Sequence, residues 1–162
     1  MGTSFGSSLL AAILTMWAPA SAQPAQPQFS ITISTEKTEV KAGSELFIKV
    51  QMKNISDHEV DCSRVPTNGW DGAYQYDVRD THGNLAERKL LVPGHPEIKG
   101  ASSIWPCILK PGESTNDDHI ISRLYDLSHP GKYAIQVSRL ITGGHKEDGV
   151  VKSNTITITV TP

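Results

Sequence analysis

Apolar and polar residues alternate with a period of two in several stretches of this chain, and turn residues separate the stretches. The clearest combination starts at His129-Pro130-Gly131, where proline fixes φ and glycine is free to adopt a positive φ. After this turn, Tyr133, Ile135 and Val137 alternate with polar or small residues. Because successive side chains of a strand point to opposite faces, the pattern predicts a strand with one buried face.

The same period predicts further strands, whereas no stretch has the i, i+3, i+4, i+7 spacing of an amphipathic helix. We expect strands at residues 29–34, 46–53, 74–79, 85–91, 119–121 and 155–160, with a short continuation of the first at Glu39-Val40. About seven short strands separated by Gly and Pro turns predict an all-β chain folded as an antiparallel β-sandwich.

The N-terminal segment is predicted to be a signal peptide, residues 1–22. Its apolar run, residues 9–18, is about half the length that a membrane span needs, and it ends in Ala20-Ser21-Ala22, the small-x-small pattern of a signal peptidase site. Residues 23–28 form a Pro/Gln linker, and residues 29–162 form the domain. We therefore expect a secreted or periplasmic protein without a membrane anchor after cleavage. The net charge of −2 gives no footprint for nucleic acid.

The sequence has two cysteines, Cys62 and Cys107. Disulfides persist in exported proteins, so we expect this pair to form one bridge that closes a loop of about 45 residues. Two buried free thiols are the alternative.

Several segments together resemble an immunoglobulin-like domain of bacterial secreted proteins: residues 40–46, Lys53-Asn54, and residues 76–84, 109–113 and 125–137. The same turn motifs are similar to those of the intracellular proteinase-inhibitor family of bacteria, which lacks an export signal. The resemblance implies an immunoglobulin-like sandwich with a tyrosine corner formed by Leu127, Gly131 and Tyr133, in which the phenol bonds to upstream backbone. The inter-sheet disulfide of antibody domains is absent, because Ile135 stands at one of its two positions.

Catalytic and metal-binding motifs are sparse. None of the six histidines has H-x-H or H-x₃-H spacing, and there is no G-x-S-x-G elbow or phosphate-binding glycine loop. In a strand, Asp117 and His119 would share one face. We expect no catalytic residue, no metal and no cofactor.

Four aromatic residues lie in or near the region that the cysteines would connect: Trp70, Tyr74, Tyr76 and Trp105. They could form a sugar-stacking or protein-binding surface. In the alternative interpretation, one tryptophan fills the core and the two tyrosines pack on one face of their strand.

These observations predict an exported, non-enzymatic binding or protein-interaction domain whose partner is another protein or a polysaccharide. One alternative is an extracellular protease inhibitor that uses the Pro-rich segment Pro93–Pro111 as a preorganised loop. A carbohydrate-binding module using Trp70 and Trp105 is a second alternative, and a small metal-dependent enzyme using Asp117 and His119 is a third.

Overall fold

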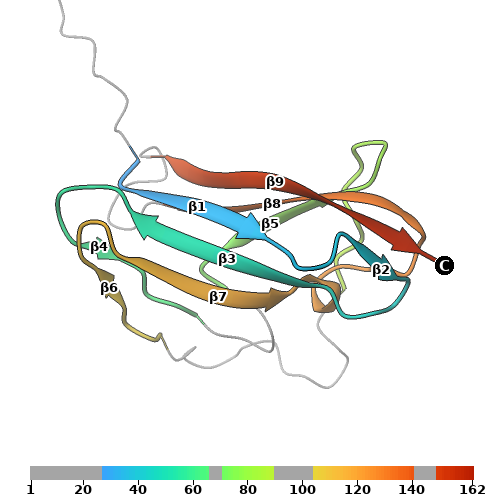
Figure 1. Cartoon of the computed structure of the whole chain (residues 1–162), viewed down its shortest axis with the longest axis horizontal. Coiled ribbons are helices and arrows are strands. Elements are labelled where there is room, and N and C mark those ends of the chain that lie inside the picture. The colour runs from blue at the N-terminus through green and yellow to red at the C-terminus, as the bar shows by residue number, and fades with distance from the viewer. Residues whose placement is uncertain (1–26, 66–70, 90–103, 141–148) are drawn as a thin grey trace, which may run out of the picture.

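Two β-sheets lie face to face in the computed structural model, which describes residues 27–65, 71–89, 104–140 and 149–162 (Figure 1). The first sheet has the order β1-β3-β7, with β1 at Phe29–Ser34, β3 at Phe47–Asn54 and β7 at Ser114–Ile120. Both pairings in this sheet are antiparallel.

The second sheet has the order β2-β9-β8-β5. Its strands are β2 (Glu39–Lys41), β9 (Val150–Thr161), β8 (Gly131–Leu140) and β5 (Gln75–Arg79). The strand β2 runs parallel to β9, whereas β8 pairs with β9 and β5 in antiparallel fashion. The N-terminal part of the domain is thus divided between the two sheets, β1 in one and β2 in the other. With the three-against-four strand arrangement, this division makes the chain an immunoglobulin-like β-sandwich, as predicted.

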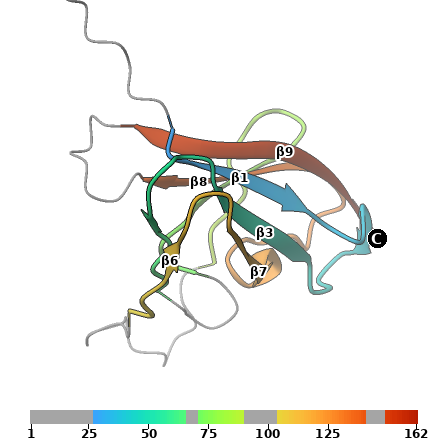
Figure 2. The same cartoon turned by 60° about the vertical axis from the view of Figure 1, so that its left-hand side comes forward.

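A third, two-stranded sheet lies at one end of the sandwich, where β4 (Val60–Asp61) pairs with β6 (Ile108–Leu109) (Figure 2). A single turn of 3₁₀ helix, η1 (Ile121–Arg123), follows β7. No helix in the described ranges is long and apolar enough to cross a membrane.

The core follows from the period-two pattern. In β3 the buried apolar side chains are Ile48, Val50 and Met52, and the residues between them face solvent. The alternating residues of β1, β5, β8 and β9 cover them from both sheets: Phe29, Ile31, Ile33, Val78, Tyr133, Ile135, Val137, Ile158 and Val160.

The predicted tyrosine corner is present at the start of β8. The hydroxyl of Tyr133 donates a hydrogen bond of 3.0 Å to the backbone oxygen of His129, and Leu127 is buried in the core. This bond ties the loop before β8 to the strand itself.

The predicted strand at 85–91 is wrong for the residues described. Leu85 makes an isolated bridge to Arg79, and Arg88 makes one to Tyr125. The backbone N–H of Lys89 donates to Leu124 instead of to β5, so the chain leaves the sheet after one bridge.

Two strand boundaries also differ from those predicted. The strand β7 begins at Ser114, five residues before the predicted start, because its polar residues pair fully with β3. The strand β9 begins at Val150 rather than Thr155. A register shift between Gln136 and Ser138 of β8 changes which β9 residues point inward, and this shift breaks the alternation in the sequence.

Candidate functional site

The most distinctive local structure is a short antiparallel ribbon crossed by a disulfide, here called the disulfide ribbon (residues 60–65 and 104–109). Beyond the β4-β6 pair, the N–H of Cys62 donates to Cys107, and Arg64 and Trp105 exchange two backbone hydrogen bonds of 2.9 Å. The disulfide Cys62–Cys107 connects the two strands, as predicted. A two-stranded ribbon is marginally stable by itself, so the covalent link fixes its register.

The near end of the ribbon is held by apolar packing and one buried amide. Val60, Cys62 and Leu109 belong to the core. Asn54 is 0% exposed, and its side-chain nitrogen donates to the backbone oxygens of His58 at 2.7 Å and Leu109 at 2.9 Å. Because this nitrogen is buried and already bonded, the Asn54-Ile55-Ser56 sequon is not available for glycosylation in the folded domain.

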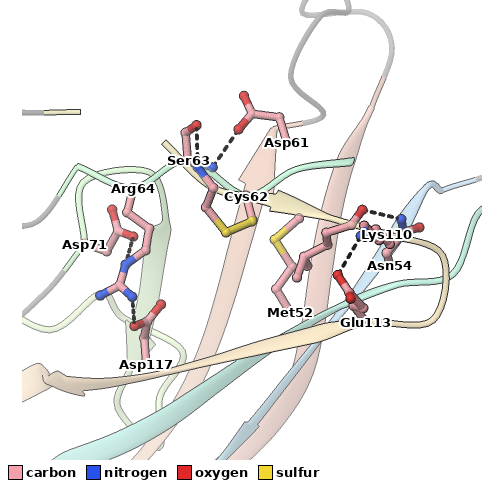
Figure 3. The surroundings of a disulfide bond; sticks show 12 residues. Met52, Asn54, Asp61, Cys62, Ser63, Arg64, Asp71, Lys110, Glu113 and Asp117 are labelled. Atoms are coloured by element: carbon pink, nitrogen blue, oxygen red, sulfur yellow. Dashed lines mark hydrogen bonds and ion pairs between the residues drawn. A yellow bond between two sulfur atoms is a disulfide. The ribbon is translucent and has the colours of Figure 1, made fainter. Parts of the chain in front are cut away.

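The far end (residues 63–65 and 104–106) is held by charged groups instead. Figure 3 shows the guanidinium of Arg64 between two carboxylates. Its Nη1 lies 2.5 Å from Oδ1 of Asp117, and its Nε lies 3.9 Å from Oδ2 of Asp71. The other oxygen of Asp71 accepts hydrogen bonds from the backbone N–H groups of Val65 and Ala73. A carboxylate before β5 and another on β7 thus fix the same arginine.

A second arginine reaches the far end from β8. Arg139 is buried, and its Nη2 donates to the backbone oxygen of Ser63 at 2.8 Å. Its guanidinium carbon lies 5.3 Å from the centre of the Tyr74 ring, in the range of a cation–π contact.

His119 on β7 completes the group. It is 2% exposed, its Nδ1 lies 2.8 Å from the hydroxyl of Tyr76, and its ring contacts the rings of Tyr74 and Tyr76. Burial lowers the pKa of His119 to about 4, although the carboxylate of Asp71 acts in the opposite direction. Burial also raises the pKa of Asp117, against the effect of Arg64. The imidazole is therefore neutral at pH 7.

This polar cluster (Arg64, Asp71, Tyr76, Asp117, His119 and Arg139) is only partly satisfied. Four of its buried atoms have no hydrogen-bond partner among the described residues: Arg64 Nε, Asp71 Oδ2, His119 Nε2 and Arg139 Nη1. An unpartnered buried polar atom costs about 1–3 kcal/mol, and a half-satisfied network is the less stable kind of buried polar group. The far end is consequently held by contacts that a change of charge can weaken.

Strand alternation predicted that Asp117 and His119 share one face. The structure has both residues on one face of β7, and this face is buried. In this structure Asp117 pairs with Arg64, and Nδ1 of His119 is bonded to the hydroxyl of Tyr76. Within the described ranges, no group of three or more His, Cys, Asp or Glu side chains is arranged to hold a metal ion.

The four aromatic residues do not form one binding surface. Tyr74 is 5% exposed and packs in the core, and Tyr76 points inward to His119. Both therefore follow the alternative interpretation, in which they pack on one face of their strand. Trp105 is 56% exposed and pairs with Arg64, whose guanidinium lies 6.0 Å from its ring centre, so it does not fill the core. Trp70 lies outside the described residues.

An apolar face on the ribbon itself was not predicted from the sequence. Ile104, Pro106 and Ile108 alternate with Trp105, Cys107 and Leu109, and the two isoleucines are 65% and 57% exposed. Alternation on either side of Cys107 was the signal that could have revealed this face. The predicted inhibitory segment Pro93–Pro111 overlaps it from Ile104 onward, while residues 93–103 lie outside the described part.

No known family model matches the sequence, and no curated protein is similar to it. Among solved structures, the chain is similar to a CARDB domain from Pyrococcus furiosus, with 14% identity over 91% of this chain and 100% of that one and a TM-score of 0.44. It is also similar to 16% of a β-glucosidase from Listeria innocua, with 16% identity over 82% of this chain and a TM-score of 0.45. The ASH/PapD-like domain of human CEP192 matches at 12% identity over 93% of each chain, with a TM-score of 0.33. The assignment of the fold therefore rests on the strand order described above.

Proposed function

We propose that this chain is an exported, non-enzymatic domain that binds another protein through the outward face of the disulfide ribbon and Trp105. The observation that carries the proposal is the exposure of Ile104, Trp105 and Ile108 on a ribbon that is fixed by a disulfide. Contiguous exposed apolar residues mark interaction sites, and a rigid binding segment loses little conformational entropy on association. Export is supported by the signal-like residues 1–22 and by the disulfide.

The side chains on this face favour a protein over a polysaccharide. Sugars stack on exposed aromatic rings, but Ile104, Pro106 and Ile108 are aliphatic or cyclic without a π system. Of the three predicted aromatic residues that are described, Trp105 is the exposed one, and Arg64 already covers part of its ring. Tryptophan and arginine, in contrast, are common in the energetic centres of protein interfaces.

Protease inhibition is a second candidate, because residues 104–106 and Ile108 are exposed and Cys107 holds this segment through the disulfide. A panel of serine, cysteine and metalloproteases, assayed with the intact and the reduced protein, tests this version. The expected result is inhibition of one class that is lost on reduction.

Site-specific photo-crosslinking in the producing cells tests the binding proposal. A benzoylphenylalanine is introduced at Ile108, and in parallel at Leu85, which is equally exposed but lies outside the ribbon. We expect one defined protein adduct from position 108, absent at position 85 and abolished when Ile104 and Trp105 are both changed to serine. Equal labelling at the two positions, or a purified protein that turns over a substrate, would refute the proposal.

A further inference from the structure

The disulfide ribbon is attached to the sandwich by different chemistry at its two ends. The near end uses core residues and the neutral amide of Asn54. The far end uses the polar cluster, through the contacts of Arg64 with Asp117 and Asp71 and the bond from Arg139 to Ser63. A change in protonation can therefore act on the far end without acting on the near end.

His119 is the member of the cluster whose protonation is least compatible with the closed arrangement. Its Nε2 has no partner among the described residues, so an imidazolium would carry an unbonded, charged N–H in a buried site. Ionisable groups from every neighbouring element face His119. The ribbon contributes Arg64, and β8 contributes Arg139, which lies against the ring of Tyr74. The others are Asp71, Tyr74 and Tyr76 from the β5 region and Asp117 and Asp118 on its own strand. The nearby positive charge of Arg64 repels the protonated ring, whereas Asp71 and Asp118 attract it.

We propose that the far end of the disulfide ribbon is an acid-released latch: when His119 is protonated, residues 63–65 and 104–106 detach from the sandwich while the disulfide and the near end stay in place. The latch could control binding only if the function proposed above is correct, because detachment would change the positions of Trp105 and Ile104 in the proposed binding surface. Arg64 is the mechanical link, since it contacts the cluster through its side chain and pairs with Trp105 through its backbone.

The direction of the effect follows from linkage. Protons bind His119 more readily in the open form, where its pKa returns to the ordinary 6.5, than in the closed form, where it is about 4. Lowering the pH from 7.5 to 5 should therefore raise the ratio of open to closed ribbon about 30-fold. Asp117 acts in the opposite direction, because its pKa is raised in the closed form, and it makes the net change smaller than this value.

Hydrogen exchange of single amides, measured by NMR on the intact protein and corrected for the intrinsic rate, tests the latch. Between pH 7.5 and pH 5, protection of the Val65 and Gly72 amides, which donate across the far end to Oδ1 of Asp71 and to the backbone oxygen of Val65, should fall 10- to 30-fold. Protection of the Cys62 amide and of β3 amides such as Val50 should not change. In a His119→Asn variant the fall should disappear, and in the control His82→Asn, which alters an exposed histidine, it should remain. An Asp117→Asn variant should show a larger fall than the wild type.

Equal loss of protection in the ribbon and in β3 would mean global unfolding and would overturn the latch, as would an unchanged response in the His119→Asn variant. If that variant does not fold, the wild type and the Asp117→Asn variant still test the latch. In both proteins the ribbon amides should lose protection in acid while the β3 amides keep theirs. The exchange experiment needs no partner, so its failure leaves the binding proposal untouched. Conversely, a ribbon that binds no protein can still open in acid.

Discussion

The buried imidazole of His119 makes the stability of this domain depend on pH in a predictable way. Its pKa is about 4 in the folded protein and about 6.5 when the chain is unfolded, so the unfolded state binds more protons between these values. The stability that the folded state owes to a neutral His119 is fully present above pH 6.5 and is lost as the pH falls toward 4. A difference of 2.5 pKa units at 1.36 kcal/mol each gives a loss of about 3 kcal/mol from this one residue.

The measurement is urea unfolding followed by tryptophan fluorescence at several pH values between 7.5 and 4, for the wild type and for His119→Asn. Asparagine can keep a hydrogen bond to Tyr76 but cannot bind a proton in this range. The variant will be less stable at pH 7.5 because of lost packing. The difference in free energy of unfolding between the wild type and the variant should narrow by about 3 kcal/mol as the pH falls to 4. Subtracting the two curves removes the contributions of Asp117 and the other carboxylates, which both proteins share.

A gap that stays constant with pH would refute the reasoning, because it would mean that His119 has the same proton affinity in both states. The exposed residue His82 provides the control. The His82→Asn variant should follow the wild-type curve within about 0.5 kcal/mol at every pH.

Three further changes test the fold and the ribbon by the same denaturation assay. Asn54→Ala leaves the buried oxygen of Leu109 without its donor and should cost about 3 kcal/mol, whereas a cost below 1 kcal/mol would show that the amide is not an anchor. Tyr133→Phe removes the corner hydrogen bond and should cost about 1 kcal/mol, and an unchanged midpoint would count against the corner. Changing Cys62 and Cys107 together to alanine should cost about 4 kcal/mol by loop entropy, and the variant, unlike the wild type, should be indifferent to reductant.

Local pattern was sufficient to predict the layers of the fold, because each core strand buries every second residue. The buried residues Ile48, Val50 and Met52 of β3 show this directly, as do Tyr133 and Ile135 of β8. The same rule failed where tertiary pairing decided the structure. The strand β7 is a polar sequence that becomes a strand because β3 pairs along its full length, and β9 changes its inward residues at a register shift. Neither event leaves a periodic signal.

The candidate site was predicted in fragments for a different reason. The cysteine count indicated the bridge, and strand alternation indicated a common face for Asp117 and His119. Their partner Arg64 comes from an isolated bridge more than fifty residues earlier, and Arg139 comes from the next strand, β8. No local pattern in the sequence connects these arginines with Asp117 and His119. For Tyr74 and Tyr76 the sequence left two interpretations open, an exposed binding surface and packing on one face of their strand, because a hydroxyl-bearing ring suits an interface and a polar core equally well.

The polar cluster also bears on why this end of the sandwich is not simply apolar. Replacing a buried ion pair by well-packed apolar residues is often neutral or stabilising, so the pairing of Arg64 with Asp117 is weak evidence of a contribution to stability. The charged contacts instead fix the position of the ribbon. The guanidinium held between Asp71 and Asp117 sets where residues 63–65, which pair with Trp105, lie on the sandwich. Leucine at position 64 could fill similar space in several registers, whereas two carboxylates on different elements define one. The cluster is therefore best understood as a positioning device for the disulfide ribbon, whose cost in stability is offset by the disulfide next to it.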